Sequence, residues 1–479
     1  MHRHGTLDNP RAERLSCDLP VNTTNMIPSF PHHDDDPEVL EQTLDCFDPA
    51  ERRAALELLM VQAEAGALPL PVPRPAVNLH AHTFYSYNAY GYSPTGFAWR
   101  ARRAGLSAGG IVDFDVLDGV DEFLAAARRV GLPACAGIET RVFVGPFADR
   151  VINSPGEPGI AYHLGMGFVT SRPTSAQAAF LARLHRIAAE RNRTIVERVN
   201  AALSPIAIDY DKEVRPLTPR GNATERHLCL AYARKARQRF PSERDLARFW
   251  SEKLGTDAAG LDLPEGPKLQ GEIRSRLMKR GGAGYVAPDQ GAFPTLEEMN
   301  RFVLSAGAIP TVAWLDGTSE GERSLKEWLD LAANSGAAAL TIIPARNYTP
   351  GKPDSKLQYL HATVGEAERR GWPVFVGTEM NSPGNRFVDD FEAPELAPLK
   401  PVFLKGGRVA AAHTALQSAA GMGYLSEWAS RHLPKLSDRL AFFDEAGHQL
   451  DPRREMPRSA VDPALEPEQV LARLRGQAG

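Results

Sequence analysis

Short apolar segments that alternate with helical segments constrain the fold of this 479-residue chain more than any other feature. The apolar segments cover residues 76–82, 109–113, 134–139, 161–168, 309–315, 337–344 and 373–379. Repeated strand–helix units form a parallel sheet, which is either open or closed into a barrel. We predict an α/β barrel of seven strands, because a closed sheet offers a single mouth for the polar residues that follow its strands.

One part of the chain interrupts this alternation. Residues 173–290 contain long helical stretches without clear strands, which indicates a helical insertion in the barrel. The His and Asp residues at 32–36 fit a solvated leader better than a metal site. The predicted parts are a disordered leader (1–36), an N-terminal helical segment and linker (37–75), the first part of the barrel (76–172), the insertion (173–290), the second part of the barrel with closing helices (291–450) and a polar tail (451–479).

The composition argues against several classes of protein. With 55 basic and 59 acidic residues the formal net charge is −4, so a nucleic-acid-binding protein built on a large positive field is not expected. The four cysteines are scattered and form no Cys-x-x-Cys pair, which indicates a reducing compartment and no thiolate zinc site. No apolar run reaches the length of a membrane span, and the N-terminus lacks the apolar stretch of a secretory signal. We therefore expect a cytoplasmic protein.

The predicted strands end in residues that bind metal ions. His80 and His82 end the first strand, and their imidazoles project side by side because residues two apart in a strand point to the same face. Asp113 and Asp115 end the second strand, Glu139 ends the third and Glu379 the last. Imidazole and carboxylate ligands without cysteine are typical of Zn²⁺, Mn²⁺ and Fe²⁺ sites. For Asp113 and Asp115, a role as a helix cap or loop residue is an equally good interpretation.

The segments around these residues resemble the polymerase and histidinol phosphatase (PHP) superfamily of metal-dependent phosphoesterases. The matching stretches are Asn-Leu-His-Ala-His-Thr at 78–83 with Ser-Pro at 93–94, then 112–119, 137–139, 162–165 and Gly-Thr-Glu-Met-Asn at 377–381. They keep the order and approximate spacing of the family between about 76 and 390. The resemblance implies a distorted (β/α)7 barrel, usually with three metal ions at its mouth, that hydrolyses phosphate esters.

The chain departs from the PHP pattern at several metal positions. The region where the family has an aspartate holds Tyr87 and Asn88, and Phe114 stands in place of a histidine. Trp314 replaces the histidine of an Ala-His-Pro motif, and Asn381 replaces the last histidine. In the family, the missing aspartate and two of the missing histidines hold one shared metal ion. Their joint loss implies that this ion is absent from the present chain.

The residues that remain imply a smaller metal centre. His80, His82, Glu139 and Glu379 match the ligands of one metal ion of the family, and all four are present. His163 matches a ligand of a further ion, whose second histidine is replaced by a tryptophan. The resemblance therefore implies one divalent ion, or two, with Mn²⁺, Zn²⁺ and Fe²⁺ as the candidates.

Basic and polar residues near the strand ends are candidates for substrate binding. Arg346 follows the sixth strand, and its guanidinium could bind an anionic substrate, although a surface arginine is an equally good interpretation. Arg226 and His227 lie at a capped helix start whose N-terminus could face a phosphate or a carboxylate. The alternative is that both merely belong to the surface of an insertion helix. Asn381 completes the predicted substrate-binding set.

These observations predict a metal-dependent hydrolase that acts on a phosphate ester or a related small anionic substrate through a metal-activated water. Asp113, His163 and Arg346 are the predicted catalytic residues. The alternative is a catalytically degenerate PHP-like barrel that serves as a ligand-binding or regulatory module. The aromatic residues in former ligand positions favour that alternative, because they can shape a ligand pocket without chemistry.

Overall fold

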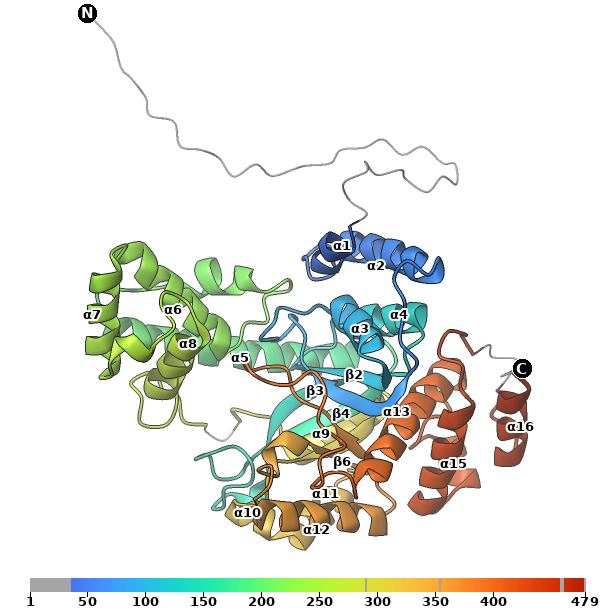
Figure 1. Cartoon of the computed structure of the whole chain (residues 1–479). Coiled ribbons are helices and arrows are strands. Elements are labelled where there is room, and N and C mark those ends of the chain that lie inside the picture. The colour runs from blue at the N-terminus through green and yellow to red at the C-terminus, as the bar shows by residue number, and fades with distance from the viewer. Residues whose placement is uncertain (1–35, 289–290, 353–354, 457–460, 478–479) are drawn as a thin grey trace, which may run out of the picture.

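The computed structural model describes residues 36–288, 291–352, 355–456 and 461–477. Of the predicted leader it describes only Asp36, so the leader and the histidines at 32 and 33 lie outside the described residues. Seven strands form one sheet in sequence order (Figure 1). They are β1 (Arg74–Ala81), β2 (Leu106–Phe114), β3 (Ala134–Phe143), β4 (Ile160–Phe168), β5 (Ile309–Trp314), β6 (Ala339–Ile342) and β7 (Val374–Val376).

The sheet is nearly closed into a barrel, and the predicted α/β barrel fold is confirmed. Neighbouring strands are parallel except for β4, which is antiparallel to both β3 and β5. The expectation of a parallel sheet is therefore wrong at β4. An irregular loop with one short 3-10 turn (Gly145–Phe147) joins β3 to β4, and an antiparallel neighbour needs no crossover helix.

The two ends of the sheet meet at the segment that follows β7. The N–H of Glu379 donates to the carbonyl of His80 (2.7 Å), and the N–H of His82 donates to the carbonyl of Glu379 (2.8 Å). Gly377 permits this approach, because a Cβ at that position would lie 2.4 Å from the backbone nitrogen of His80. The seam therefore places the ends of the first and last strands side by side.

Helices cover the outside of the barrel and bury large apolar side chains against it. Ser93 begins the first of them, because its hydroxyl accepts a hydrogen bond from the N–H of Gly96 and Pro94 occupies the first helical position. Phe97, Trp99 and other residues of this layer are fully buried. The helices of the layer are α3 (Pro94–Arg103), α4 (Val120–Val130), α9 (Leu296–Ser305), α10 (Glu320–Arg323), α11 (Leu325–Asn334) and α12 (Ser355–Arg369).

A long helix, α13 (Lys400–Ala420), packs against the start of several strands. A Cβ on Gly406 would lie 1.9 Å from the carbonyl oxygen of Val374, and one on Gly407 would lie 2.8 Å from the Val77 side chain. Two glycines therefore let the helix approach the backbone closely. Since Val77 and Val374 lie near the start of β1 and β7, α13 covers the end of the barrel opposite to the carboxyl ends of these strands.

The remaining helices near the two termini flank the barrel. α1 (Pro37–Thr43) and α2 (Pro49–Glu64) lie over α3 and α4, and α15 (Leu436–Gln449) packs on α13 (Figure 1). α14 (Glu427–His432) and α16 (Pro467–Gln477) complete this group. Among the described residues, none of the helices combines the length and the apolar character that crossing a membrane requires.

Between β4 and α9 the chain forms a helical lobe beside the barrel (Figure 1). Its helices are α5 (Ser175–Ala202), α6 (Glu225–Arg239), α7 (Glu243–Leu254), α8 (Pro267–Ile273) and the π-helical turn η5 (Arg274–Met278). The lobe has a hydrophobic cluster of its own, in which Tyr232, Trp250 and Leu246 are fully buried. Because α5 also contacts α9, one end of this helix lies against the barrel layer.

Candidate metal centre

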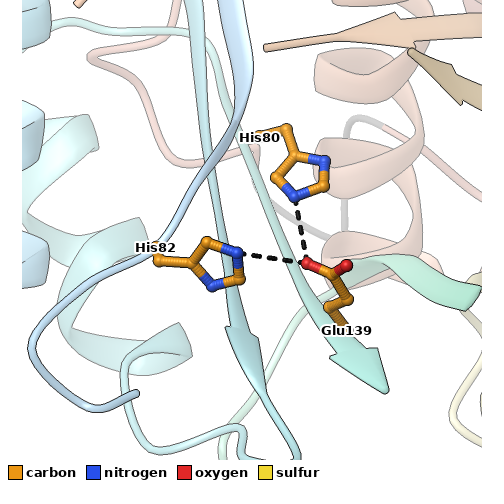
Figure 2. A group of neighbouring side chains, drawn as sticks. All are labelled: His80, His82 and Glu139. Carbon is orange, nitrogen blue, oxygen red and sulfur yellow. Dashed lines mark hydrogen bonds and ion pairs between the residues drawn. The ribbon is translucent and has the colours of Figure 1, made fainter. Parts of the chain in front are cut away.

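Three buried side chains converge at the carboxyl ends of β1 and β3. His80 and His82 come from β1 and the residue just after it, and Glu139 comes from β3. One nitrogen of each imidazole and one carboxylate oxygen all lie within 4.8 Å of one another. The Nε2 atoms of His80 and His82 each lie 3.1 Å from the same oxygen, Glu139 Oε2 (Figure 2). We call these three residues the metal-binding group.

Polar residues behind the metal-binding group orient His82. Asp113 on β2 accepts hydrogen bonds from the Thr83 N–H (2.7 Å), the Thr83 hydroxyl (2.6 Å) and the Ser86 hydroxyl (2.6 Å). The Ser86 oxygen lies 3.3 Å from Nδ1 of His82. Since the Ser86 hydrogen is directed at Asp113, the Ser86 oxygen accepts from the Nδ1–H of His82. This hydrogen-bond chain leaves the lone pair of His82 on Nε2.

This arrangement fits a cation. Nε2 of His82 is buried and has no hydrogen-bond partner among the described residues, although it lies 3.1 Å from the Glu139 oxygen. Nε2 of His80 lies 3.1 Å from the same oxygen, and its Nδ1 lies 3.4 Å from the hydroxyl of Thr341. When His82 is neutral, its Nε2 lone pair and the carboxylate oxygen repel at this distance, whereas bonds of about 2 Å to one shared ion would satisfy both. The residues present are therefore suited to hold a divalent metal ion.

The electrostatics of the metal-binding group favour charged forms despite complete burial. Burial opposes ionisation of Glu139, but the two imidazoles outweigh it and hold the pKa of the carboxyl at about 2. Burial likewise disfavours protonation of His82, but Glu139, with smaller effects of Asp113 and Glu379, raises the pKa of this imidazole above its usual value. The Glu139 carboxylate is therefore ionised, and it favours a positive charge beside it.

Asp113 does not enter the metal-binding group, and its position makes it a positioning residue for His82. We expect Asp113→Asn to weaken metal affinity about 10–100-fold, the usual cost of changing a group that orients a metal-binding histidine. An amide places a donor where the carboxylate accepts from Ser86, so the tautomer of His82 is no longer fixed. Competition with a chromophoric chelator measures the affinity. Asp149→Asn, at an exposed side chain, is the matched control, and equal affinities in the two variants would contradict the role of Asp113.

Glu379, the predicted fourth ligand, lies beside the metal-binding group without joining it. Its carboxylate accepts a hydrogen bond from the Arg346 guanidinium (2.8 Å), and the residue is not among those within 4.8 Å of one another. Its backbone has φ 61°, and Met380 follows with φ 57°. A left-handed conformation at two consecutive non-glycine residues is costly and is typical of functional sites. The structure therefore brings Glu379 to the site and directs its side chain to Arg346.

His163 is not brought to the metal-binding group. Its Nε2 lies 2.5 Å from the Oδ1 of Asn300 on α9. The preceding residue, Tyr162, lines a cavity beside the metal-binding group. Because residues alternate between the faces of a strand, Tyr162 and His163 point to opposite sides of β4. Burial lowers the pKa of His163 to about 4, so its imidazole is neutral at physiological pH.

The metal-binding group borders a cavity of about 610 Å³. His80, Glu139 and Glu379 line it at the barrel, and residues of the helical lobe line the other side. Three aromatic residues in positions where the family has metal ligands also line the cavity: Tyr87, Phe114 and Trp314. The ring of Phe114 stacks on His82 with 4.3 Å between centroids.

The predicted substrate-binding residues divide into two groups. Arg346, Arg226 and Asn381 line the cavity. His227 is not among the lining residues, because it caps the start of α6: its Nδ1 accepts a hydrogen bond from the Thr224 N–H (3.0 Å). Burial lowers the pKa of His227 to about 4. The interpretation of His227 as part of the helix structure describes its contacts better than a role in substrate binding.

Asp115, a carboxylate that the sequence places at the end of the second strand, lines the same cavity. It is half-buried, has φ 61° and accepts a hydrogen bond from the Thr140 hydroxyl (2.5 Å). Sequence reasoning missed other charged residues of the cavity. Arg141 follows Glu139 by two residues, so strand alternation alone places it on the same face. Arg274 and Lys279 come from the lobe, and no local pattern relates them to the barrel.

No model of a known protein family matches the chain, and no curated protein matches its sequence. Two solved structures are similar over much of its length. An amidohydrolase from Chromobacterium violaceum, with bound sulfate and no metal, shares 21% identity over 66% of this chain and 91% of its own, with a TM-score of 0.43. A predicted metal-dependent phosphoesterase from Bifidobacterium adolescentis shares 18% identity over 70% of this chain and 98% of its own, with a TM-score of 0.43. Identities and TM-scores this low assign neither a family nor a reaction to the chain.

Proposed function

We propose that this chain is a metal-dependent hydrolase with one divalent ion bound by His80, His82 and Glu139. The substrate we propose is a phosphate ester or a related small anionic molecule. The observation that carries the proposal is the buried Nε2 of His82, which faces a carboxylate oxygen at 3.1 Å and has no hydrogen-bond partner among the described residues. An unsatisfied buried polar atom is costly, and an ion shared by this nitrogen and the carboxylate would satisfy both.

The ligand set narrows the choice of metal. Two imidazole nitrogens and one carboxylate oxygen suit Zn²⁺, Mn²⁺ or Fe²⁺, and three protein ligands leave positions open for water and substrate. An ion held there would act as a Lewis acid and would lower the pKa of a water that it binds. The aromatic ring of Phe114 against His82, and the direction of His163 toward Asn300, support one ion in preference to two.

The residues of the chain itself would bind and orient the substrate. Arg346 lines the cavity, its side chain is 46% exposed, and its guanidinium is held by the Glu379 carboxylate. A guanidinium fixed in this way can present its free N–H groups to a phosphate or carboxylate of the substrate. Glu379 would then position Arg346, in addition to any contact with the ion.

Metal analysis of the purified protein tests the proposal. We expect about one equivalent of a transition metal per chain after gentle purification. Hydrolysis of at least one substrate in a panel of phosphate monoesters, phosphodiesters and lactones should depend on added Mn²⁺, Zn²⁺ or Fe²⁺. Less than about half an equivalent of metal, together with no activity on the panel, would contradict the proposal and would favour the ligand-binding module.

A further inference from the structure

The cavity beside the metal-binding group is lined by an excess of basic side chains. Five of them line the cavity and are neither fully buried nor exposed: Arg141, Arg191, Arg226, Arg274 and Lys279. Two carboxylates lie among them, Glu157 and Glu225. Figure 1 shows that α5 and α6, which bear two of these basic residues, belong to the lobe beside the barrel. We call the five basic residues the basic wall.

Each carboxylate is shared between two basic residues. Glu225 faces the guanidinium of Arg274 (2.9 Å) and the ammonium of Lys279 (2.7 Å). Burial opposes its ionisation, but the two cations hold the pKa of Glu225 at about 2. In contrast, burial lowers the pKa of Lys279 despite its contact with Glu225. One carboxylate therefore serves two cations that burial destabilises.

Glu157 is likewise shared between two basic residues of this wall. Glu157 lies 2.9 Å from Arg141 and 3.7 Å from Arg191. Among the residues that the structure describes, Arg226 has no carboxylate within hydrogen-bond distance, and its guanidinium donates to the hydroxyl of Ser382 (3.3 Å). Asp115 lines the same cavity and adds a third carboxylate, so five cations face three carboxylates and two positive charges remain unmatched in a partly desolvated cavity. Such an excess is costly unless an anion binds.

We propose that the basic wall binds a phosphate-type dianion. A phosphate supplies two negative charges and several acceptor oxygens, and arginine guanidinium groups match this geometry. A carboxylate supplies one charge and would leave a larger excess unmatched.

The basic wall begins close to the metal-binding group. Arg141 and Glu139 are two residues apart on the same face of β3, which separates their Cα atoms by about 7 Å. Both side chains line the same cavity. If the proposed function is right, on which this step rests, the substrate carries a phosphate group in addition to the ester that is hydrolysed, and the two groups are a few bonds apart.

Binding of inorganic phosphate, followed by isothermal titration calorimetry, tests the site without a known substrate. We expect Arg226→Gln to weaken phosphate binding about tenfold, the usual loss for one charge-assisted contact. Glu225→Gln should tighten it, because this change leaves Arg274 and Lys279 without their shared carboxylate. The opposite signs separate an effect on charge from a loss of folding. Arg276→Gln, whose exposed side chain pairs with Glu272 outside the cavity lining, is the matched control.

The outcomes also separate this site from the metal centre. His82→Ala should bind phosphate as the wild type does, so a failure of the metal proposal leaves the basic wall testable. Phosphate binding that is lost in His82→Ala and unchanged in Arg226→Gln would overturn the inference. Acetate that binds as tightly as phosphate would overturn the assignment of a dianion, and absence of phosphate binding to the wild type at millimolar concentration would overturn the site itself.

Discussion

Glu139→Gln is expected to leave the purified protein with less than about a tenth of an equivalent of divalent metal and to lower kcat/KM more than about 100-fold, a larger effect than changes behind a metal ligand produce. The amide has the shape of the carboxylate but lacks its charge, and both imidazoles of the metal-binding group face the oxygen that changes. Metal analysis by mass spectrometry and the hydrolysis assay measure the two effects.

Two further substitutions help to interpret the loss of metal and activity in Glu139→Gln. Glu368→Gln makes the same chemical change at an exposed helix position and should keep metal and activity at wild-type levels. Glu379→Gln tests the predicted fourth ligand. Because its carboxylate is paired with Arg346, we expect metal content to stay above half an equivalent and the KM for an anionic substrate to rise. A Glu139→Gln protein that retains a full equivalent of metal would contradict the assignment of the site.

Thermal unfolding separates loss of the ion from damage to the fold. A ligand present at 100 times its Kd stabilises the folded state by about 2.7 kcal/mol, so metal should raise the Tm of the chelator-treated wild type. The same addition should leave the Tm of Glu139→Gln unchanged. Equal shifts in both proteins would mean that the metal binds elsewhere.

The barrel was predictable because each strand is a short apolar segment between helix signals. All seven predicted segments overlap the strands of the structure. What the sequence could not give was the direction of β4, since its neighbours along the chain are an irregular loop and the lobe. The register of β4 with β3 and β5 decides which face of the strand carries His163, and the sequence does not reveal this register.

The metal-binding group was predictable in part. His80 and His82 share a face because of strand geometry, and Glu139 lies on β3, two positions along the sheet. The pairing of Glu379 with Arg346 depends on a left-handed backbone after β7, which no pattern of side chains announces. The basic wall depends on how the lobe lies against the barrel, and that is a tertiary relation between distant segments.

A buried carboxyl in the segment between β7 and α13 is expected to make the stability of the protein depend on pH. Asp389 is 5% exposed, and neither of its carboxyl oxygens has a well-oriented hydrogen bond from the described residues. Burial raises its pKa from 3.8 to about 7, opposed by the charge of Arg386 and by the backbone N–H of Ala345, and assisted by Asp390. Burial, together with the charge of Asp389, also raises the pKa of the Tyr348 hydroxyl. Folding therefore favours the protonated form of Asp389.

The sign of the resulting pH dependence follows from proton linkage. Between pH 3.8 and about 7 the folded protein keeps a proton on Asp389 that the unfolded chain releases. The free energy of unfolding therefore falls as pH rises through this window, and it stays lowered above pH 7. Three pKa units correspond to about 4 kcal/mol, which is an upper bound for this group. Glu322, whose pKa burial raises to about 7, acts in the same direction.

Asp389→Asn should remove the contribution of Asp389, because an amide has the shape of the protonated carboxyl and cannot ionise. We expect the variant to resist urea more than the wild type at pH 8, by up to about 4 kcal/mol, and by only about 1 kcal/mol near pH 4.5. Urea unfolding midpoints at the two pH values measure the difference. Asp390→Asn, at the exposed neighbouring position, should shift neither midpoint by more than about 0.5 kcal/mol. An Asp389→Asn protein less stable than the wild type at pH 8 would show that the carboxylate is stabilised by a partner and that its pKa is not raised.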